Sequence, residues 1–197
     1  MEEMDVIDRF LNVFIAYIDS GFGLLQADVA YLTSTLIVID VTLAGLFWAL
    51  SEGSDVISGL LKKVLYVGFF AFLLSNFSFL ADTVFQSFAG LGIKAGSATL
   101  TAEDLMRPGY IASVGFQAAL PLLEDIADML GPIAFFENFV MIAVLLIAWA
   151  VILIAFFILA VQLFVSILEF KLTTLAGFVL VPFALWNKTA FLAERVL

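Results

Sequence analysis

An apolar run from Ile133 to Leu168 is the feature that most constrains how this chain can fold. Only Glu137, Asn138 and Gln162 interrupt the run, and it contains neither glycine nor proline. As one helix it would be about 54 Å long, whereas the hydrocarbon core of a bilayer is about 30 Å thick. We therefore expect one long membrane helix that projects beyond the bilayer at one end.

The rest of the chain is also too apolar for a water-soluble domain. Hydrophobic residues make up 64% of the sequence, against about 45–50% in a typical soluble domain. Two further segments, Val29–Leu50 and Val64–Leu80, are candidate spans, and the first would be about 33 Å long as a helix. The predicted fold class is therefore an all-α, polytopic helical membrane protein.

The segment before the first span predicts an amphipathic helix. In residues 4–19 the charged and amide side chains fall on one stripe at helical spacing, and apolar residues fill the remaining surface. Ser20 to Gly23 is the expected break after this helix. The N-terminus is acidic and has no cleavage-site pattern, so it does not indicate a cleaved signal peptide.

The region between the second and third spans predicts short helices packed on the membrane surface or against other subunits. Thr101 and Asp104 have the spacing of a capping box that opens a helix, and Pro121 predicts a kink further on. The predicted organisation therefore has four regions: 1–28, 29–81, 82–132 and 133–197.

The segment 172–186 is apolar but short for a span. It contains Gly177 and Pro182, which weaken or break helices. It can be a fourth span, thinned or tilted, or a re-entrant segment buried in protein. The helical pattern that resumes at Thr189 favours the span, whereas the charge of Lys188 favours re-entrance.

The distribution of lysine and arginine predicts the orientation of the spans. Lys62 and Lys63 lie between the first two spans, which indicates an inside location for that link. The N-terminal segment and the region 82–132, both rich in acidic residues, would then lie outside. Lys171, after the third span, would lie inside.

Polar residues within the apolar segments are the candidate sites. An ionised Asp40 at the centre of a span costs about 2.5–3.5 kcal/mol, and no histidine, lysine or arginine within the spans is expected to pair with it. It can contact another subunit or a lumen, pack locally against Thr35 or Thr42, or act as a proton or ion relay. The other candidates for interhelical or oligomer contacts, rather than substrate ligands, are Asn76, Glu137, Asn138 and Gln162.

Charged residues at the ends of the apolar runs are predicted membrane-boundary anchors. Glu169 and Lys171 flank one boundary, either as exposed anchors or as a salt bridge between subunits. The remaining predicted anchors are Lys62, Lys63 and Lys188.

The sequence offers little for catalysis. It contains no cysteine and no histidine, and no phosphate-binding, dinucleotide-binding or zinc-protease motif. The acidic groups at 103–104 and 124–128 lack the spacing of a calcium loop and indicate a solvated face. Eighteen acidic and eight basic residues give a net charge of −10, which argues against direct nucleic-acid binding. We expect no enzymatic activity, cofactor or metal.

Two segments carry a family resemblance. EFKLTTLAGFVLVPFALWNKTAFLAERVL, from Glu169 to Leu197, resembles the signature region of the TrbL family, and DLMRPGYIASVGFQ, from Asp104 to Gln117, is similar to the segment before that family's central membrane helices. The resemblance implies a component of a conjugative type IV secretion system in the bacterial inner membrane, with the outside regions and the N-terminus periplasmic. It also implies that the sequence ends before the further spans and polar tail of such proteins.

The resemblance implies a structural role rather than a motor. The implied partners are other copies in a ring of five, further inner-membrane subunits, pilin or stalk subunits, cytoplasmic ATPases and membrane lipid. Such an assembly serves pilus formation and the translocation of DNA with its relaxase, or of proteins. The alternative function is a small-solute transporter or ion channel that uses Asp40 as its coupling residue.

Overall fold

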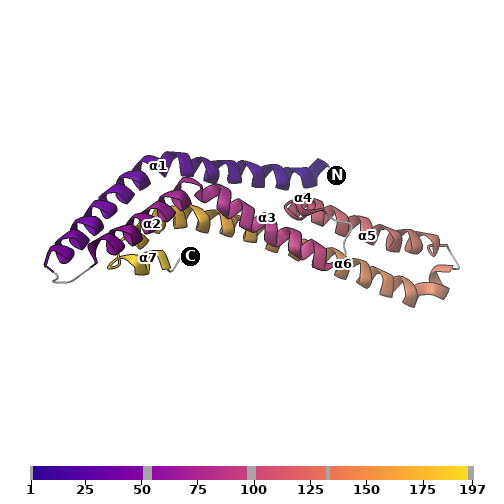
Figure 1. Ribbon diagram of the computed structural model, residues 1–197. Coiled ribbons are helices and arrows are strands. Elements are labelled where there is room, and N and C mark those ends of the chain that lie inside the picture. The colour runs from indigo at the N-terminus through magenta and orange to yellow at the C-terminus, as the bar shows by residue number, and fades with distance from the viewer. Residues whose placement is uncertain (1, 51–54, 97–100, 132–133, 195–197) are drawn as a thin grey trace. The chain divides into compact units, whose positions relative to one another are not determined.

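The computed structural model describes residues 2–50, 55–96, 101–131 and 134–194, and these residues form helices and no β-strand (Figure 1). The predicted all-α class is confirmed. The helices, in chain order, are α1 (Glu2–Leu50), α2 (Val56–Ser75), α3 (Phe77–Gly96), α4 (Ala102–Leu105), α5 (Pro108–Asp128), α6 (Ala134–Leu180), the 3₁₀ helix η1 (Val181–Leu185) and α7 (Ala190–Glu194).

Three of the described helical segments are long and apolar enough to cross a membrane. They are Val6–Leu50, Val56–Ser75 and Ala134–Leu185. The third has the highest mean hydropathy, 3.2, and contains the long apolar run that dominates the sequence. The prediction of a helical membrane protein is therefore confirmed.

Helix α1 shows that the predicted break at Ser20–Gly23 is wrong, because the helix continues through these residues. The Ser20 hydroxyl donates a hydrogen bond to the Tyr17 carbonyl within the helix, at 2.7 Å. A Cβ at Gly21 would lie 3.0 Å from the side chain of Leu175, so this glycine permits a close contact with α6. A helical glycine costs only about 1 kcal/mol, and packing offsets a cost of that size.

The predicted second span, 64–80, falls across the junction of two helices. Asn76 ends α2, and its backbone N–H bonds to the carbonyls of Phe72 and Leu73. The next helix starts at once, since the Leu80 N–H donates to the Asn76 carbonyl at 2.9 Å. The chain therefore changes helix at Asn76 without a loop.

The predicted capping box at Thr101 and Asp104 is confirmed at the start of α4. The side-chain hydrogen bond from Thr101, followed by its backbone hydrogen bond, lowers the pKa of the Asp104 carboxyl below its ordinary value. Helix α5 then begins at Pro108 and contains Pro121 without ending there.

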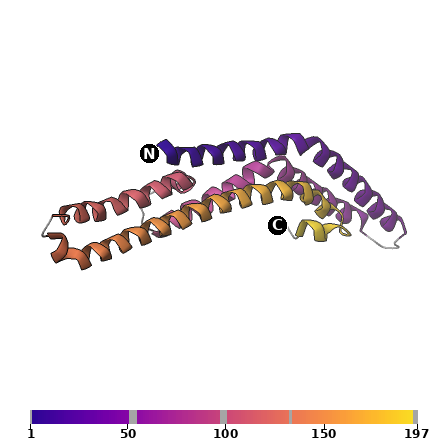
Figure 2. The same ribbon diagram turned by 180° about the vertical axis from the view of Figure 1, so that it is seen from behind.

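The segment 172–186 does not form a separate helix. Residues up to Leu180 extend α6, so the predicted break at Gly177 is absent. Helix α6 ends two residues before Pro182, which lies in the first turn of η1, where its missing N–H is tolerated. Figure 2 shows the chain turning back after η1 into α7.

The described residues form two compact units, each built from segments far apart in sequence. Unit 1 contains α1 up to Phe14 together with 88–169, and unit 2 contains 15–87 together with the chain from Phe170 onward. The predicted boundaries after residues 28 and 81 fall inside α1 and α3. Residues 1, 132, 133 and 197, at which predicted regions begin or end, lie outside the described residues. The assignment of the four predicted regions to the membrane or to its two sides stays a prediction.

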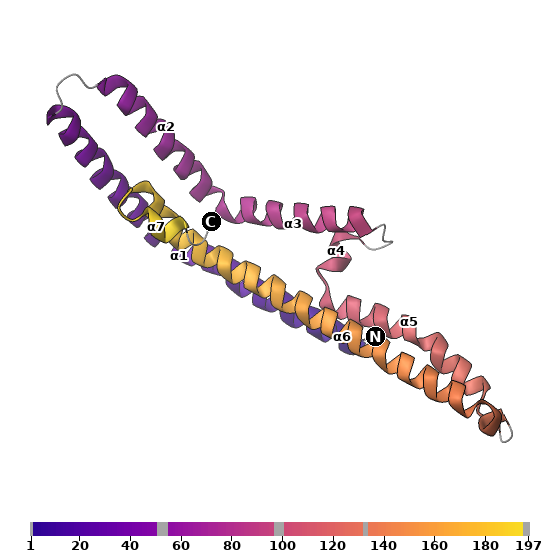
Figure 3. The same ribbon diagram turned by 90° about the horizontal axis from the view of Figure 1, so that it is seen from below.

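Unit 1 is centred on a helical hairpin in which α5 lies beside the first half of α6 (Figure 3). The two helices approach closely at Gly115, where an added Cβ would collide with Cβ and Cγ of Phe156. The start of α1 packs on the same hairpin, with the rings of Phe10 and Phe164 stacked at 6.2 Å between centroids.

Candidate functional site

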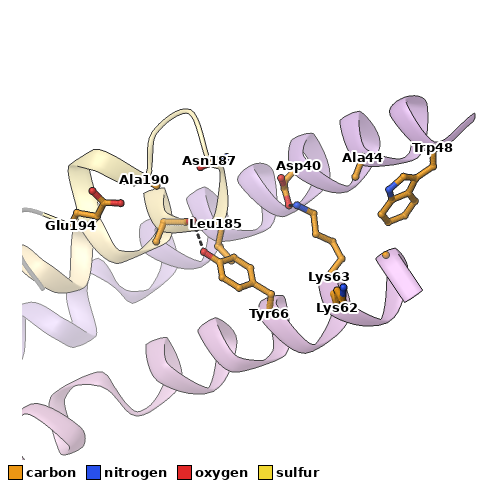
Figure 4. A pocket seen from close by; sticks show the side chains of 12 residues that line it. Asp40, Ala44, Trp48, Lys62, Lys63, Tyr66, Leu185, Asn187, Ala190 and Glu194 are labelled. Atoms are coloured by element: carbon orange, nitrogen blue, oxygen red, sulfur yellow. Dashed lines mark hydrogen bonds and ion pairs between the residues drawn. The ribbon is translucent and has the colours of Figure 1, made fainter. Parts of the chain in front are cut away.

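Asp40 and Lys63 form an ion pair within unit 2. The Lys63 Nζ on α2 lies 2.6 Å from Oδ2 of Asp40 on α1 (Figure 4). The Asp40 side chain is 10% exposed and that of Lys63 is 29% exposed. The expectation that no lysine would pair with Asp40 is therefore wrong.

This contact also links two predictions about depth in the membrane. Asp40 was expected at the centre of a span, and Lys63 was expected at a membrane boundary. Because their charged atoms are in contact, the two residues lie at one level, and both expectations cannot hold. Lys63 is the eighth residue of α2, which begins at Val56, so it belongs to this helix rather than to the link between the helices.

A second ionic cluster joins three helical segments of unit 2. The Lys171 Nζ lies 3.0 Å from Oδ1 of Asp19 and 2.9 Å from Oδ1 of Asp82. These residues come from α6, α1 and α3, and the Lys171 side chain is only 13% exposed. We call Asp19, Asp82 and Lys171 the Lys171 triad.

The Lys171 triad corrects the predicted orientation. Charge counting assigned Asp19 and Asp82 to the outside and Lys171 to the inside. A lysine in hydrogen-bond contact with both carboxylates cannot be separated from them by a bilayer. The triad also forms within one chain, so Lys171 does not need a partner subunit to neutralise its charge. The exposed Glu169 is not part of it.

Asp8 is a buried polar residue in unit 1 whose role the sequence did not indicate. It is 5% exposed, and its Oδ1 accepts a hydrogen bond of 2.7 Å from the backbone N–H of Gly109. Its Oδ2 lies 3.3 Å from Nε of Arg107. Arg107 is the N-cap residue of α5, but its side chain does not accept a hydrogen bond from the first turn of that helix. The Asp8 carboxylate on α1 supplies this acceptor instead, together with a negative charge that is favourable at a helix N-terminus.

Within the single chain described, the other predicted polar residues make no hydrogen bond to another helix, and their part in oligomer contacts stays a prediction. The amides of Asn76 and Asn138 donate to carbonyls of their own helices, at Phe72 and Ala134, each at 2.9 Å. Gln162 is exposed and makes no hydrogen bond within the described part of the chain. Glu137 is exposed in the first turn of α6, where a negative charge is favourable.

The Asp40–Lys63 pair lies in a cavity of about 600 Å³ within unit 2. Figure 4 shows its walls, which come from α1, α2, η1 and α7. The Tyr66 hydroxyl donates to the Ala184 carbonyl at 2.9 Å and so connects α2 to η1. Lys62 and Lys63 line the cavity, and the third predicted anchor, Lys188, directly follows Asn187, another of the lining residues.

These features connect helices within each unit. The two ionic clusters join helices and satisfy charges in apolar surroundings. Among the residues described, no group of three or more histidine, cysteine, aspartate or glutamate side chains could hold a metal ion.

Comparison with known proteins gives a family for most of the chain. The family model described as TrbL/VirB6 plasmid conjugal transfer protein matches residues 37–197. No curated protein and no solved structure shows a significant match.

Proposed function

This chain belongs to the TrbL/VirB6 plasmid conjugal transfer protein family, and we propose that it is a structural, oligomeric platform of the conjugation machine. As a member of the family it is a membrane component of conjugal transfer. The platform would lie in the bacterial inner membrane, support pilus or stalk assembly, and serve translocation of DNA with its relaxase or of protein substrates.

The observation that supports a platform is the apolar surface that one copy leaves exposed. No residue of α2 is buried, and Phe69 and Phe72 are 59% and 60% exposed. Helix α6 likewise presents exposed side chains along its length, including Val140 and Ile154. Such a surface needs lipid or protein against it, and copies of the same chain around an axis would cover part of it.

The proposed partners follow the family's part in a secretion system. They are further copies of this chain, for which five is the number that the resemblance implied, other inner-membrane subunits, pilin or stalk subunits, and cytoplasmic ATPases. The chain has no phosphate-binding motif, so energy would come from those ATPases. We propose neither catalysis nor direct nucleic-acid contact, since the net charge of −10 opposes a phosphate backbone.

The oligomer is the first point to test. The protein would be extracted in a mild detergent, and its mass would be measured by native mass spectrometry and by light scattering during size-exclusion chromatography. We expect a closed homo-oligomer and, after deletion of the gene, loss of both pili and conjugal transfer. A monomer in several mild detergents and in lipid nanodiscs would overturn the platform proposal.

The alternative of a transporter or channel centred on Asp40 receives no support from the geometry. Lys63 already neutralises Asp40 at 2.6 Å, and the pair connects two helices of one chain. A coupling carboxylate would need to exchange this partner for a proton or ion during each cycle.

For orientation, we propose that the end of unit 2 carrying Lys62, Lys63 and Lys188 faces the cytoplasm. Positively charged residues gather on that side of bacterial membranes. The N-terminal direction of α1 would then point to the periplasm. Single cysteines at Lys188 and Asp82 would be labelled with a membrane-impermeant maleimide before and after cell lysis. We expect Asp82→Cys to react in intact cells and Lys188→Cys only after lysis, and the reverse pattern would overturn the orientation.

A further inference from the structure

The two ionic clusters of unit 2 lie about one bilayer thickness apart. Asp19 of the Lys171 triad and Asp40 are separated by 21 residues of α1. This separation corresponds to about 32 Å along the helix, and the hydrocarbon core of a bilayer is about 30 Å thick. The clusters also connect α1 to its neighbours at both levels, because Lys63 contacts Asp40, and Asp82 shares Lys171 with Asp19.

The segment 64–81, which runs from one cluster to the other, identifies the region between them as the part surrounded by hydrocarbon. It contains no charged residue, and Phe69, Phe72 and Phe79 in it are 59%, 60% and 68% exposed. An uncharged helical segment with exposed phenylalanines is typical of a membrane span. Because the clusters connect both ends of this segment to α1, the bilayer that surrounds it also surrounds residues 20–39 of α1 (Figure 1).

Asp28 on α1 lies within this depth, nine residues from Asp19 and twelve from Asp40. Its side chain is exposed and makes no hydrogen bond or ion pair within the described part of the chain. A carboxylate at such a depth is costly when it faces lipid, and acidic residues inside membranes face protein or a water-filled space instead. In the membrane, the side of α1 that carries Asp28 is therefore covered by something other than acyl chains.

Helical spacing places Asp28 on one face of α1 with Tyr31 and Thr35, and all three side chains are exposed. We call these three residues the Asp28 face. Tyr31 is 75% exposed, and its hydroxyl has no hydrogen-bond partner among the residues described. The opposite side of α1, which includes Ala30 and Ile37, lines a cavity of about 240 Å³ together with α2. The Asp28 face therefore points away from α2.

We propose that copies of this chain meet through their Asp28 faces around the axis of the oligomer, while α2 faces lipid. This arrangement depends on the proposed oligomer and assigns its contact surface to one side of unit 2. A second copy fits the face, because each copy brings an acceptor, the Asp28 carboxylate, and a donor, the Tyr31 hydroxyl. In a ring the copies lie at one level. Tyr31 lies only about 4.5 Å along the helix from Asp28, so the hydroxyl of one copy can reach the carboxylate of the next.

Cross-linking in membranes tests which face the copies share. The chain contains no cysteine, so single cysteines can be introduced into the full chain. Tyr31 and Phe72 form a matched pair, because each is an exposed aromatic residue nine positions from the Asp40–Lys63 pair on its own helix. Tyr31→Cys, Thr35→Cys and Phe72→Cys would be treated with a short bifunctional thiol reagent and separated by denaturing electrophoresis. We expect linked dimers from Tyr31→Cys and Thr35→Cys, and monomers from Phe72→Cys.

Substitutions at the face test the contact itself. Asp28→Ala and Tyr31→Phe each remove one partner of a charge-assisted hydrogen bond and should weaken self-association about tenfold for each contact. Native mass spectrometry of the full chain at increasing dilution in one detergent measures the change. Asp125→Ala removes an exposed carboxylate of α5 outside unit 2 and is the matched control, with no expected effect. Unchanged or stronger association in Asp28→Ala, or equal weakening in Asp125→Ala, would overturn the proposal.

The outcomes separate this contact surface from the platform proposal. An oligomer that is linked through Phe72→Cys but not through Tyr31→Cys or Thr35→Cys would show that copies meet through α2, and would leave the platform proposal standing. An oligomer linked at all three positions equally, or at none of them, would also overturn the Asp28 face alone. A monomer by native mass spectrometry would overturn the platform proposal and this contact with it.

Discussion

The Lys63 ammonium on α2 contacts the Asp40 carboxylate on α1 at 2.6 Å. Both helices are apolar enough to cross a membrane. Each residue by itself would be costly in such surroundings. Together they form a neutral pair that fixes the register of one helix against the other. The pair therefore makes the packing of α1 on α2 sensitive to either residue.

Replacement of one partner should destabilise the protein more than replacement of both. Lys63→Met leaves the Asp40 side chain, which is 10% exposed, without its cation, and we expect a loss of about 3 kcal/mol of stability. Asp40→Leu should have a similar effect. The double variant Asp40→Leu with Lys63→Met removes both charges and should be close to the wild type. Thermal unfolding in one detergent, followed by circular dichroism, measures all four proteins.

The comparison with Lys62 provides the control for this pair. Lys62→Met changes the neighbouring exposed lysine, which makes no ion pair among the described residues, and should alter stability little. Equal destabilisation by Lys62→Met and Lys63→Met would contradict the assigned role of the pair. A double variant as unstable as the sum of the singles would do so too.

The Asp40–Lys63 contact could have been predicted from the sequence. In an antiparallel helical hairpin, residues at similar distances from the turn lie side by side. Asp40 precedes the end of α1 at Leu50 by ten residues and Lys63 follows the start of α2 at Val56 by seven, a difference of less than one helical turn. The positive-inside rule alone places Lys63 at a membrane boundary, because it treats positive charge only as a signal of topology and not as a partner for Asp40.

The Lys171 triad should stabilise the packing of three helices through one ammonium group. Lys171→Met leaves Asp19 and Asp82 facing each other as like charges. Since both carboxylates are more than 40% exposed, solvent screens their repulsion, and the free energy of unfolding should fall by only about 1–2 kcal/mol. Hydrogen exchange should rise in segments 15–23 and 78–87, and mass spectrometry of peptides measures it.

Salt and a conservative variant distinguish the triad from simple packing. Lys171→Arg keeps the charge and should retain most of the protection, whereas Lys171→Met should not. Added salt should lower the stability of the wild type more than that of Lys171→Met. Equal protection in the wild type and Lys171→Met would show that the triad does not hold these helices together.

Contacts such as the Lys171 triad and the Asp8 cap could not be predicted because they join residues far apart in sequence. Periodicity predicts which residues form helices and where apolar faces lie, and it correctly indicated the helical membrane class. It does not indicate which helix lies against which. The stripe containing Asp8 was predicted only as the polar face of an amphipathic helix, and the structure buries the Asp8 carboxylate against the start of α5. The incorrect prediction of a break at Ser20–Gly23 has the same origin, since the side chain of Leu175 occupies the space beside Gly21.

The Asp8 carboxylate should protect the first turn of α5. Asp8→Ala removes the acceptor for the Gly109 N–H and the partner of Arg107, and a hydrogen bond to a charged group contributes about 1.5–3 kcal/mol. We expect at least tenfold faster amide exchange at the start of α5. Asp8→Asn keeps an acceptor oxygen and should be intermediate. Unchanged exchange in Asp8→Ala would contradict the cap.

The close approach of α5 and α6 at Gly115 should make any larger residue at this position destabilising. A Cβ at this position would overlap Cβ and Cγ of Phe156, and Cβ of Phe156 cannot move without a shift of the α6 backbone. Gly115→Ala should therefore lower the free energy of unfolding by about 1–3 kcal/mol, despite the higher helix propensity of alanine.

Gly68→Ala is the matched control, because no atom lies within 4 Å of the added Cβ and α2 is helical there. This variant should be neutral or stabilising by up to about 1 kcal/mol. Thermal unfolding of the two variants measures the difference. Phe156→Gly removes both clashing atoms, so a smaller cost of Gly115→Ala in the Phe156→Gly background would show that the cost arises at this contact. If both glycine variants behave alike, the helices do not pack as closely as described.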